Sequence, residues 1–209
     1  MTKRHLKSNK APKSWAIHRK AQKYAMRPNP GAHGLELGMP ISLLLKRLHH
    51  ANTTKECRNI LYTHDVLVDG RRVKDTKFMV GFMDVVSFPA LKEHYRVCLD
   101  GKGRLVYNKI SEKDAAFNAY KIRKKTMLKG GRLQLNCSSN INLIVDKDEY
   151  KVGDTVLLSI PNKKIQKHLK FENGASVVLT KGSHVGKTGV VEDIRDGILV
   201  YKNSEGNMG

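Results

Sequence analysis

The sequence predicts an α+β protein made of several small modules, and three observations support this fold class. Helical periodicity is confined to a short stretch after residue 40, whereas short alternating strands separated by turn signals fill most of the rest. A length of 209 residues leaves room for several modules of roughly 50–80 residues, each with a modest core. The expected order is a basic extended N-terminal arm (1–39), a helix–helix–hairpin (40–92), a small β-barrel-like central domain (93–172) and an SH3-like β module (173–209).

Positive charge is concentrated in the N-terminal arm. The chain has 39 Lys and Arg against 19 Asp and Glu, a formal net charge of +20, and no acid precedes Glu36. The arm contains three prolines and no apolar periodicity, so we expect it to be disordered alone and to order against a polyanion. Trp15 lies within this charge, where it could stack on a nucleobase or anchor the arm to the protein body.

Two helices are expected next. Pro40 precedes residues 41–48, whose apolar side chains recur at i, i+3, i+4 and i+7 and therefore share one face. Thr53 and Glu56 have the spacing of a capping box, which predicts the start of a second short helix.

The remaining elements are expected to be mostly strands. Asp69-Gly70 and Gly130-Gly131 are typical of hairpin turns, and Ser111 with Asp114 caps a short helix carrying Ala115, Ala116 and Ala119. Strands are expected over residues 66–68, from 73, and over 83–88, 95–99, 104–109, 133–137, 156–160, 177–180, 190–191 and 198–201.

The cysteines and the N-terminal sequence indicate the cellular compartment of the protein. Cys57, Cys98 and Cys137 are odd in number and far apart, which argues against a disulfide framework and a zinc site and favours buried free thiols. The N-terminus has no apolar core of a signal peptide, and no run approaches the roughly 20 apolar residues of a membrane helix. We expect a cytoplasmic protein with no metal and no cofactor.

Two segments resemble known RNA-binding modules. The helix–helix–hairpin of residues 40–90 resembles the S-four RNA-binding domain, which implies phosphate contacts from its exposed cations. The Gly-rich basic loop 181–189 and the apolar residues after it resemble a KOW motif, in which such a loop lies against a nucleic-acid backbone. Gly186-Lys187-Thr188 is also similar to the end of a P-loop, but Lys181 stands where that motif needs a glycine.

Taken in order, the whole chain resembles the archaeal and eukaryotic small-subunit ribosomal protein S-four-e family. The matching segments are Ala11-Pro12-Lys13-Ser14-Trp15, Arg27-Pro28-Asn29-Pro30-Gly31-Ala32-His33, Gly81-Phe82-Met83-Asp84-Val85, Asp100-Gly101-Lys102-Gly103-Arg104 and Tyr150-Lys151-Val152-Gly153-Asp154-Thr155. The resemblance implies a structural constituent of the small ribosomal subunit that binds rRNA and stabilises its fold during translation. It also implies a ribosome-associated monomer whose partners are small-subunit rRNA and neighbouring ribosomal proteins, with no DNA or membrane partner.

Two other classes of protein share some of these features. A pseudouridine synthase would carry a similar RNA-binding module beside a large catalytic domain, but no Arg-Leu-Asp motif occurs here, and His49-His50 lacks the spacing of a metal motif. A free transcription or RNA-chaperone factor would share the charge and the modules. The long acid-free arm favours permanent burial among rRNA helices over a regulator that cycles on and off.

The predicted RNA contacts follow from the arm and the two resemblances. They are Lys3, Arg4, Lys7, Lys13, Trp15, Arg19, Lys20, Arg27, Arg47, Arg58, Arg71, Arg72, Lys74, Lys77, Lys181, His184 and Lys187. Contacts of this kind position a protein on RNA without reading its sequence.

Overall fold

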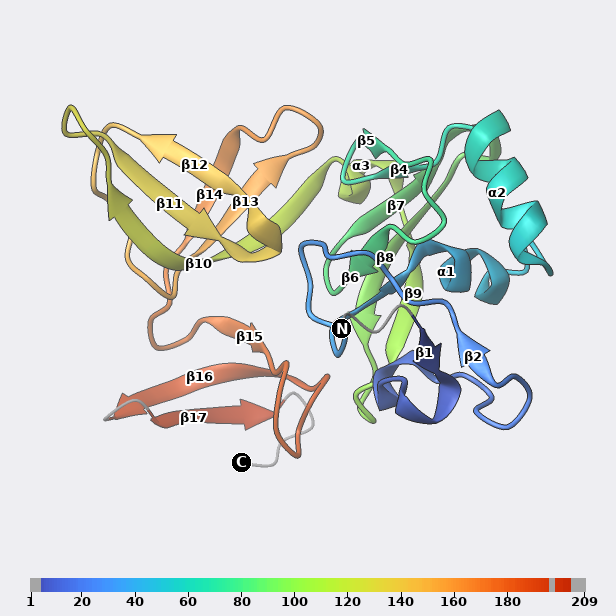
Figure 1. The fold of residues 1–209 in the computed structure, drawn as a ribbon. Coiled ribbons are helices and arrows are strands. Elements are labelled where there is room, and N and C mark those ends of the chain that lie inside the picture. Colours follow the sequence, from blue (N-terminus) through green and yellow to red (C-terminus); the bar gives the residue numbers. More distant parts are fainter. Residues whose placement is uncertain (1–4, 196–197, 204–209) are drawn as a thin grey trace. The chain divides into compact units, whose positions relative to one another are not determined.

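A computed structural model describes residues 5–195 and 198–203 and divides the chain into two compact units. The first unit comprises Met1–Cys98 and Arg104–Ala116, and the second comprises Leu99–Gly103 and Phe117–Gly209. Strands dominate both units and the α-helices lie in the first, so the mixed, mainly β fold class is confirmed (Figure 1).

The first unit is built on a five-stranded sheet with two short two-stranded ribbons and two longer helices. Its helices are α1 (Ile41–Arg47), α2 (Thr54–Thr63), α3 (Glu112–Ala115) and the 3-10 turns η1 (Ser8–Lys10), η2 (Lys13–Trp15) and η3 (Pro89–Leu91). Its strands are β1 (Leu6–Lys7), β2 (Tyr24–Ala25), β3 (Gly38–Pro40), β4 (Leu67–Val68), β5 (Arg71–Arg72), β6 (Met79–Gly81), β7 (Val85–Phe88), β8 (Glu93–Leu99) and β9 (Leu105–Ile110).

Local sequence signals account for the helices. Three apolar side chains of α1, those of Ile41, Leu44 and Leu45, are fully buried, as the periodicity predicts. At the start of α2 the Thr53 hydroxyl accepts a hydrogen bond from the Glu56 amide while the Glu56 carboxylate accepts from the Thr53 amide, so the capping box is confirmed. The two helices contact each other at one side of the unit (Figure 1).

The sheet of the first unit has the order β5-β4-β7-β8-β9. Asp69 and Gly70, with φ of 47° and 75°, form the tight turn between β4 and β5, as the sequence predicts. Strand β8 pairs with β7 through Val85↔Arg96 to Phe88↔Glu93, so this sheet continues across the boundary predicted at residue 92. The separate pairing of β3 with β6 was not predicted, because it joins short segments far apart in the sequence.

The second unit contains two antiparallel sheets. Its strands are β10 (Phe117–Met127), β11 (Leu133–Cys137), β12 (Asn142–Val145), β13 (Thr155–Ser159), β14 (Ile165–Leu169), β15 (Ser176–Val178), β16 (Thr188–Arg195) and β17 (Ile198–Asn203), with the 3-10 turn η4 (Ser138–Asn140). One sheet has the order β12-β11-β10-β13-β14 and the other has the order β15-β16-β17.

The long strand β10 shapes the larger sheet of this unit. Its first half pairs with β13 and its second half pairs with β11, with a register shift between Ile122 and Lys124. The two halves thereby enclose one core, whose central side chains include Tyr120, Leu135 and Leu158. The sheet is open, since its order begins at β12 and ends at β14, and Ala119 lies in β10 instead of the predicted helix.

One turn geometry occurs in both units, each time with a buried aspartate. Asp84 is 3% exposed and accepts a hydrogen bond from the Gly81 amide (2.8 Å), while the Val97 amide donates to its carbonyl (3.0 Å). Asp154 is also 3% exposed and accepts from the Lys151 amide (3.0 Å), while the Ile122 amide donates to its carbonyl (2.8 Å).

A histidine completes each of these turns. Nε2 of His33 lies 2.9 Å from both carboxylate oxygens of Asp84, and Nε2 of His168 lies 2.7 Å from Oδ2 of Asp154. The Phe171 amide donates a further hydrogen bond to Asp154 (3.0 Å). Each carboxylate therefore joins a turn to a segment distant in the sequence.

The Asp154 turn predicts a pH-dependent stability. Burial alone would raise the pKa of Asp154, but the amides of Phe171 and Lys151 and the contact with His168 hold this pKa below its ordinary value. The stabilisation is therefore present above about pH 4 and lost as pH falls through the lower folded pKa. We expect Asp154→Asn to reduce the free energy of unfolding by about 1–3 kcal/mol at neutral pH. Urea titrations measure the free energy of unfolding of this variant and of the unmodified protein, and the difference between the two should become smaller in acid. The control is Asp146→Asn, which changes an exposed side chain and should have little effect on the free energy of unfolding at any pH.

Candidate nucleic-acid interface

Trp15 fixes the N-terminal arm to the first unit. The side chain is fully buried, and its Nε1–H is placed to donate to the carbonyls of Leu35 (3.0 Å) and Gly38 (2.8 Å). This geometry decides between the two roles that the sequence left open, in favour of the anchor. The inclusion of Trp15 among RNA contacts is therefore corrected, since a fully buried ring has no face available for stacking on a base.

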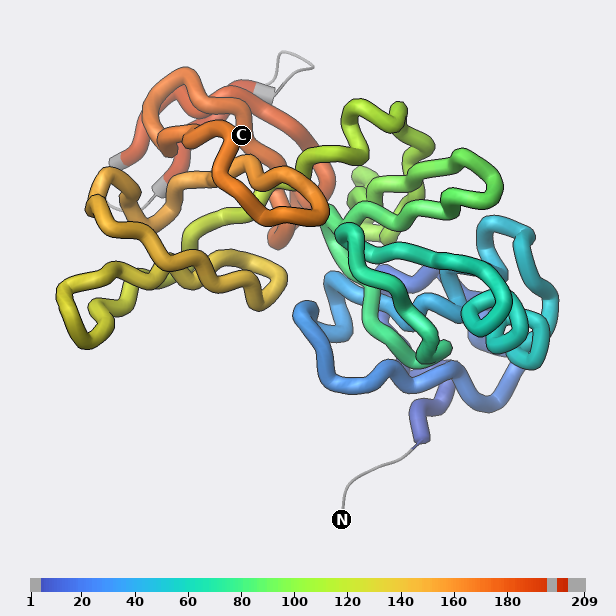
Figure 2. The backbone as a smooth tube through the Cα atoms, turned by 90° about the horizontal axis from the view of Figure 1, so that it is seen from above, coloured from blue at the N-terminus to red at the C-terminus, as the bar shows by residue number. Residues whose placement is uncertain are grey.

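Further contacts hold the arm along its length. The Arg47 guanidinium donates to the carbonyls of Ala16 (2.8 Å) and Leu105 (3.4 Å), so this predicted RNA contact is engaged within the protein. The Asn29 amide donates to the Lys77 carbonyl (3.0 Å). The described part of the arm thus follows the surface of the first unit, contrary to the expected disorder (Figure 2).

The cations of the arm are displayed by this fixed backbone. Lys7, Lys13, Lys20 and Arg27 are exposed, whereas Lys3 and Arg4 lie outside the described residues. Arg19 is half-buried and donates to the carbonyls of Asn9 (3.1 Å) and Ala11 (3.0 Å), so it shapes the arm itself. The exposed cations form an array whose spacing is set before any partner binds.

A second set of predicted cations lies on α2, on β5 and in the loop between β5 and β6. Arg58, Arg71, Lys74 and Lys77 are exposed. Arg72 forms an exposed ion pair with Asp65 (2.8 Å), a contact that phosphate could replace at small cost because exposed pairs contribute little. The exposure of this set leaves it available to phosphates, and the phosphate contacts stay a prediction.

The Gly-rich loop of the second unit packs on the turn at Asp100, and this contact was not predicted from the sequence. A Cβ at Gly186 would lie 2.2 Å from the carbonyl oxygen of Asp100, so only glycine allows this approach. Lys181 and His184 are exposed on the loop, and Lys187 is half-buried. The exposed Lys102 belongs to the turn at Asp100 and is a cation missing from the prediction.

Exposed cations of β10 and β14 were also missed. Residues 115–145 contain six Lys and Arg and no acid, and residues 155–171 contain four Lys and no acid. The lack of acids was the available signal, but the strand pairing that gathers these side chains was not known from the sequence.

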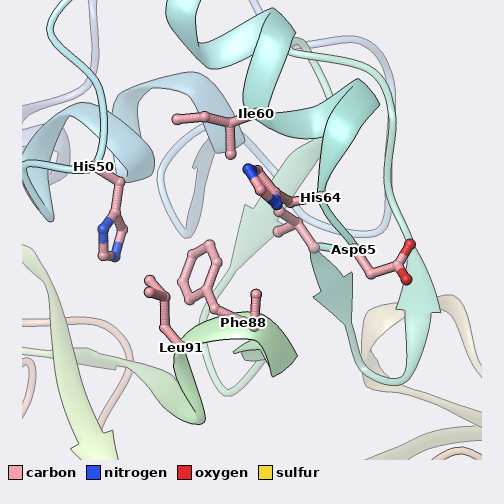
Figure 3. Close-up of a pocket in the computed structure, with 8 residues that line it drawn as sticks. His50, Ile60, His64, Asp65, Phe88 and Leu91 are labelled. Carbon is pink, nitrogen blue, oxygen red and sulfur yellow. The ribbon is translucent and has the colours of Figure 1, made fainter.

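A small apolar pocket lies beside the helices of the first unit. It has a volume of about 190 Å³ and is lined mainly by Ile60, Val66, Phe88, Leu91 and two histidines. Phe88 lies between His50 on one side and His64 on the other (Figure 3). No hydroxyl or thiol lines this pocket, so it lacks a nucleophile of the serine or cysteine type.

The thiols also lack the features of a reactive site. Cys57, Cys98 and Cys137 are free, and burial raises the pKa of each thiol. Over residues 5–195 and 198–203, no group of three or more His, Cys, Asp or Glu is arranged to hold a metal ion. None of the helices in that part of the chain is long and apolar enough to span a membrane.

These features define a class: a basic, mainly β protein whose surface carries arrays of exposed cations. Comparisons with known proteins narrow the class. Residues 91–165 match the model of Ribosomal family S4e, and residues 2–36 match the RS4NT domain.

The chain is similar over most of its length to several named proteins. It is 44% identical to a protein of Methanosphaera stadtmanae named small ribosomal subunit protein eS4, over 93% of this chain and 80% of that protein. A protein of the same name from Methanothermobacter thermautotrophicus is 43% identical, over 92% of this chain and 80% of the relative. The crystal structure of 30S ribosomal protein S4e from Thermoplasma acidophilum is similar with a TM-score of 0.70 and 32% identity, covering 82% of this chain and 90% of that one. The chain belongs to the S4e family of ribosomal proteins.

The anchoring role of Trp15 predicts a large effect on stability. Trp15→Ala should reduce the free energy of unfolding by about 3–5 kcal/mol, because it removes a fully buried ring. In the same arm, Tyr24→Ala should cost about 0.5 kcal/mol, since Tyr24 is 49% exposed. Chemical unfolding measures both. Quenching of the Trp15 fluorescence by RNA without unfolding would contradict the anchoring role.

The close approach at Gly186 predicts a difference between two glycines of one loop. Gly182 and Gly186 both have left-handed φ values, 91° and 81°, so alanine at either should cost about 1–2 kcal/mol. Only Gly186→Ala also forces a Cβ against the Asp100 carbonyl, whereas nothing lies within 4 Å of a Cβ at Gly182. Urea unfolding should therefore show a larger loss for Gly186→Ala, and equal losses would argue against the packing of the loop on the turn.

Proposed function

We propose that this chain is a structural constituent of the small ribosomal subunit, which binds rRNA and stabilises its fold during translation. The observation that carries the proposal is the similarity over 93% of the chain to a relative named small ribosomal subunit protein eS4. The S4e family consists of structural ribosomal proteins and not of enzymes. The partners are small-subunit rRNA and neighbouring ribosomal proteins, and the site of action is the ribosome.

The arm supplies the first part of the mechanism. Its exposed lysines are held in place by Trp15, Arg47 and the pair of His33 with Asp84. Each phosphate that these lysines neutralise releases counterions, which favours binding. Because the arm is already folded on the protein, little conformational entropy is lost when RNA binds.

Two further surfaces are assigned to rRNA in this proposal. Helices α1 and α2 with the β4–β5 hairpin act as an S-four-like domain, whose phosphate contacts are Arg58, Arg71, Lys74 and Lys77. Strands β15, β16 and β17 with loop 181–187 act as a KOW-type module. The exposure of these cations and the Gly186 packing support both assignments. RNA is then read by its shape, since the deep major groove of A-form helices excludes side chains.

Sedimentation of cell extracts tests the proposal directly. The protein should co-migrate in stoichiometric amounts with the small ribosomal subunit on a sucrose gradient and remain there after a high-salt wash. Migration near the top of the gradient, or loss at modest salt, would indicate a free RNA-binding regulator instead.

Neutralising the arm tests its mechanism. The variant Lys7→Gln, Lys13→Gln, Lys20→Gln changes three exposed side chains and none of the anchoring contacts. We expect weaker binding to small-subunit rRNA and a log–log salt slope smaller by about 2–3, at roughly 0.7–0.9 per phosphate contact. Filter binding over a range of salt concentrations measures the slope. A slope equal to that of the unmodified protein would remove the arm from the interface.

A further inference from the structure

One face of the larger sheet in the second unit carries cations and exposed apolar side chains together. The pairings Ala119↔Leu157↔Lys167 and Lys121↔Thr155↔Leu169 place these residues in two neighbouring rows. The alternate residues Tyr120, Val156 and Leu158 point to the opposite side, because they belong to the buried core. The residues of the two rows therefore share the outer face of β10, β13 and β14.

The exposed side chains of this face come from β10 and β14, and the residues of β13 between them are half-buried. Lys121 and Lys167 are exposed, Phe117 is 42% exposed and Leu169 is 39% exposed. Phe117 pairs with Ser159 in a third row, next to the rows that carry the lysines. The exposed lysines, the Phe117 ring and the Leu169 side chain therefore lie on the same face.

More lysines are fixed at the end of this face. In the β13–β14 turn the Lys163 amide donates to the Ser159 carbonyl (2.7 Å), and the Lys164 amide donates to the Ser159 hydroxyl (3.3 Å). Both lysine side chains are exposed. At the other end, Nζ of Lys121 lies 5.6 Å from the centre of the Phe171 ring, a cation–π contact that holds this ammonium group over the face.

The charge of this face is unbalanced by acids. No Asp or Glu occurs in β10, β13 or β14, and the sequence is free of acids over residues 115–145 and 155–171. The nearby acids are Asp154, which is buried, those in the loop of residues 146–149, and Glu172, which is exposed after the end of β14. Such a surface complements a polyanion, and its exposed aromatic ring suits a partner with flat bases.

We infer that the outer face of β10, β13 and β14 binds a single-stranded segment of RNA. The ammonium groups of Lys121, Lys163, Lys164 and Lys167 pair with its phosphates, and an unstacked base lies on Phe117 beside the aliphatic chain of Leu157. A positively charged groove with a stacking platform is the usual arrangement for binding single strands. This inference rests on the proposed function, and it assigns to unit two a binding surface apart from loop 181–187.

The test compares two pairs of lysines in the full-length protein. Lys121→Gln with Lys167→Gln removes two charges from the face, and Lys147→Gln with Lys151→Gln removes two exposed charges elsewhere in the same unit. The probes are a fluorescein-labelled oligouridine and an RNA duplex of matched length. For oligouridine, the first pair should weaken binding roughly tenfold and lower the log–log salt slope by about 1.4, at about 0.7 per phosphate. The second pair should change neither quantity.

A third variant tests the stacking platform. Phe117→Ala should weaken oligouridine binding about tenfold, as expected for one stacked base, and leave the salt slope unchanged. Duplex binding should not respond to Phe117→Ala, since paired bases are not available to the ring. Circular dichroism and thermal unfolding verify that each variant is folded.

The possible failures are distinguishable. Equal effects of the two lysine pairs, or no effect of the first pair, would overturn the inference while binding to small-subunit rRNA sustains the proposed function. Loss of incorporation into ribosomal subunits without any loss of RNA affinity would assign this face to a protein partner and also overturn the inference. An unmodified protein that binds neither small-subunit rRNA nor oligouridine would overturn the proposed function together with the inference.

Discussion

Both units depend on the same interaction. In each, a buried carboxylate accepts a hydrogen bond from a backbone amide and contacts a histidine side chain. Asp84 and Asp154 each organise a turn before a core strand, and each joins that turn to a distant segment. Through His33 the first carboxylate holds the arm, and through His168 the second holds β14. In a chain with twice as many cations as acids, these two acids are used for internal structure, which leaves the surface strongly positive.

The positive surface and the small cores both limit the stability of the folded protein. A net charge of +20 opposes compact folding through self-repulsion. Small units bury little apolar surface, so the stabilisation that opposes this repulsion is modest. Arg19 and Arg47 donate to backbone carbonyls, so these two cations serve internal structure while they keep their charge. Under the proposed function, rRNA neutralises exposed cations when it binds.

Local rules predicted local structure well. The capping box of Thr53 and Glu56, the Asp69-Gly70 turn and the apolar face of α1 each depend on residues a few positions apart, and all three are confirmed. The sequence left two roles open for Trp15 and did not indicate the engagement of Arg47, because their partners lie 20 or more residues away. The same limit applies to the surface: the exposure of Lys7, Arg58 or Lys181 agrees with the predicted contacts, but their common function remains a proposal.

The attachment of the arm also bears on the order of events when RNA is bound. An extended segment that folds on its target can adapt to several RNA shapes, whereas an arm already held by a buried indole offers only one. Under the proposed function, the protein selects from the fluctuating RNA those conformers whose phosphates match its lysines, and their population rises by mass action. On this view Trp15 makes the protein a template, and the flexible partner that takes on a new shape is the nucleic acid.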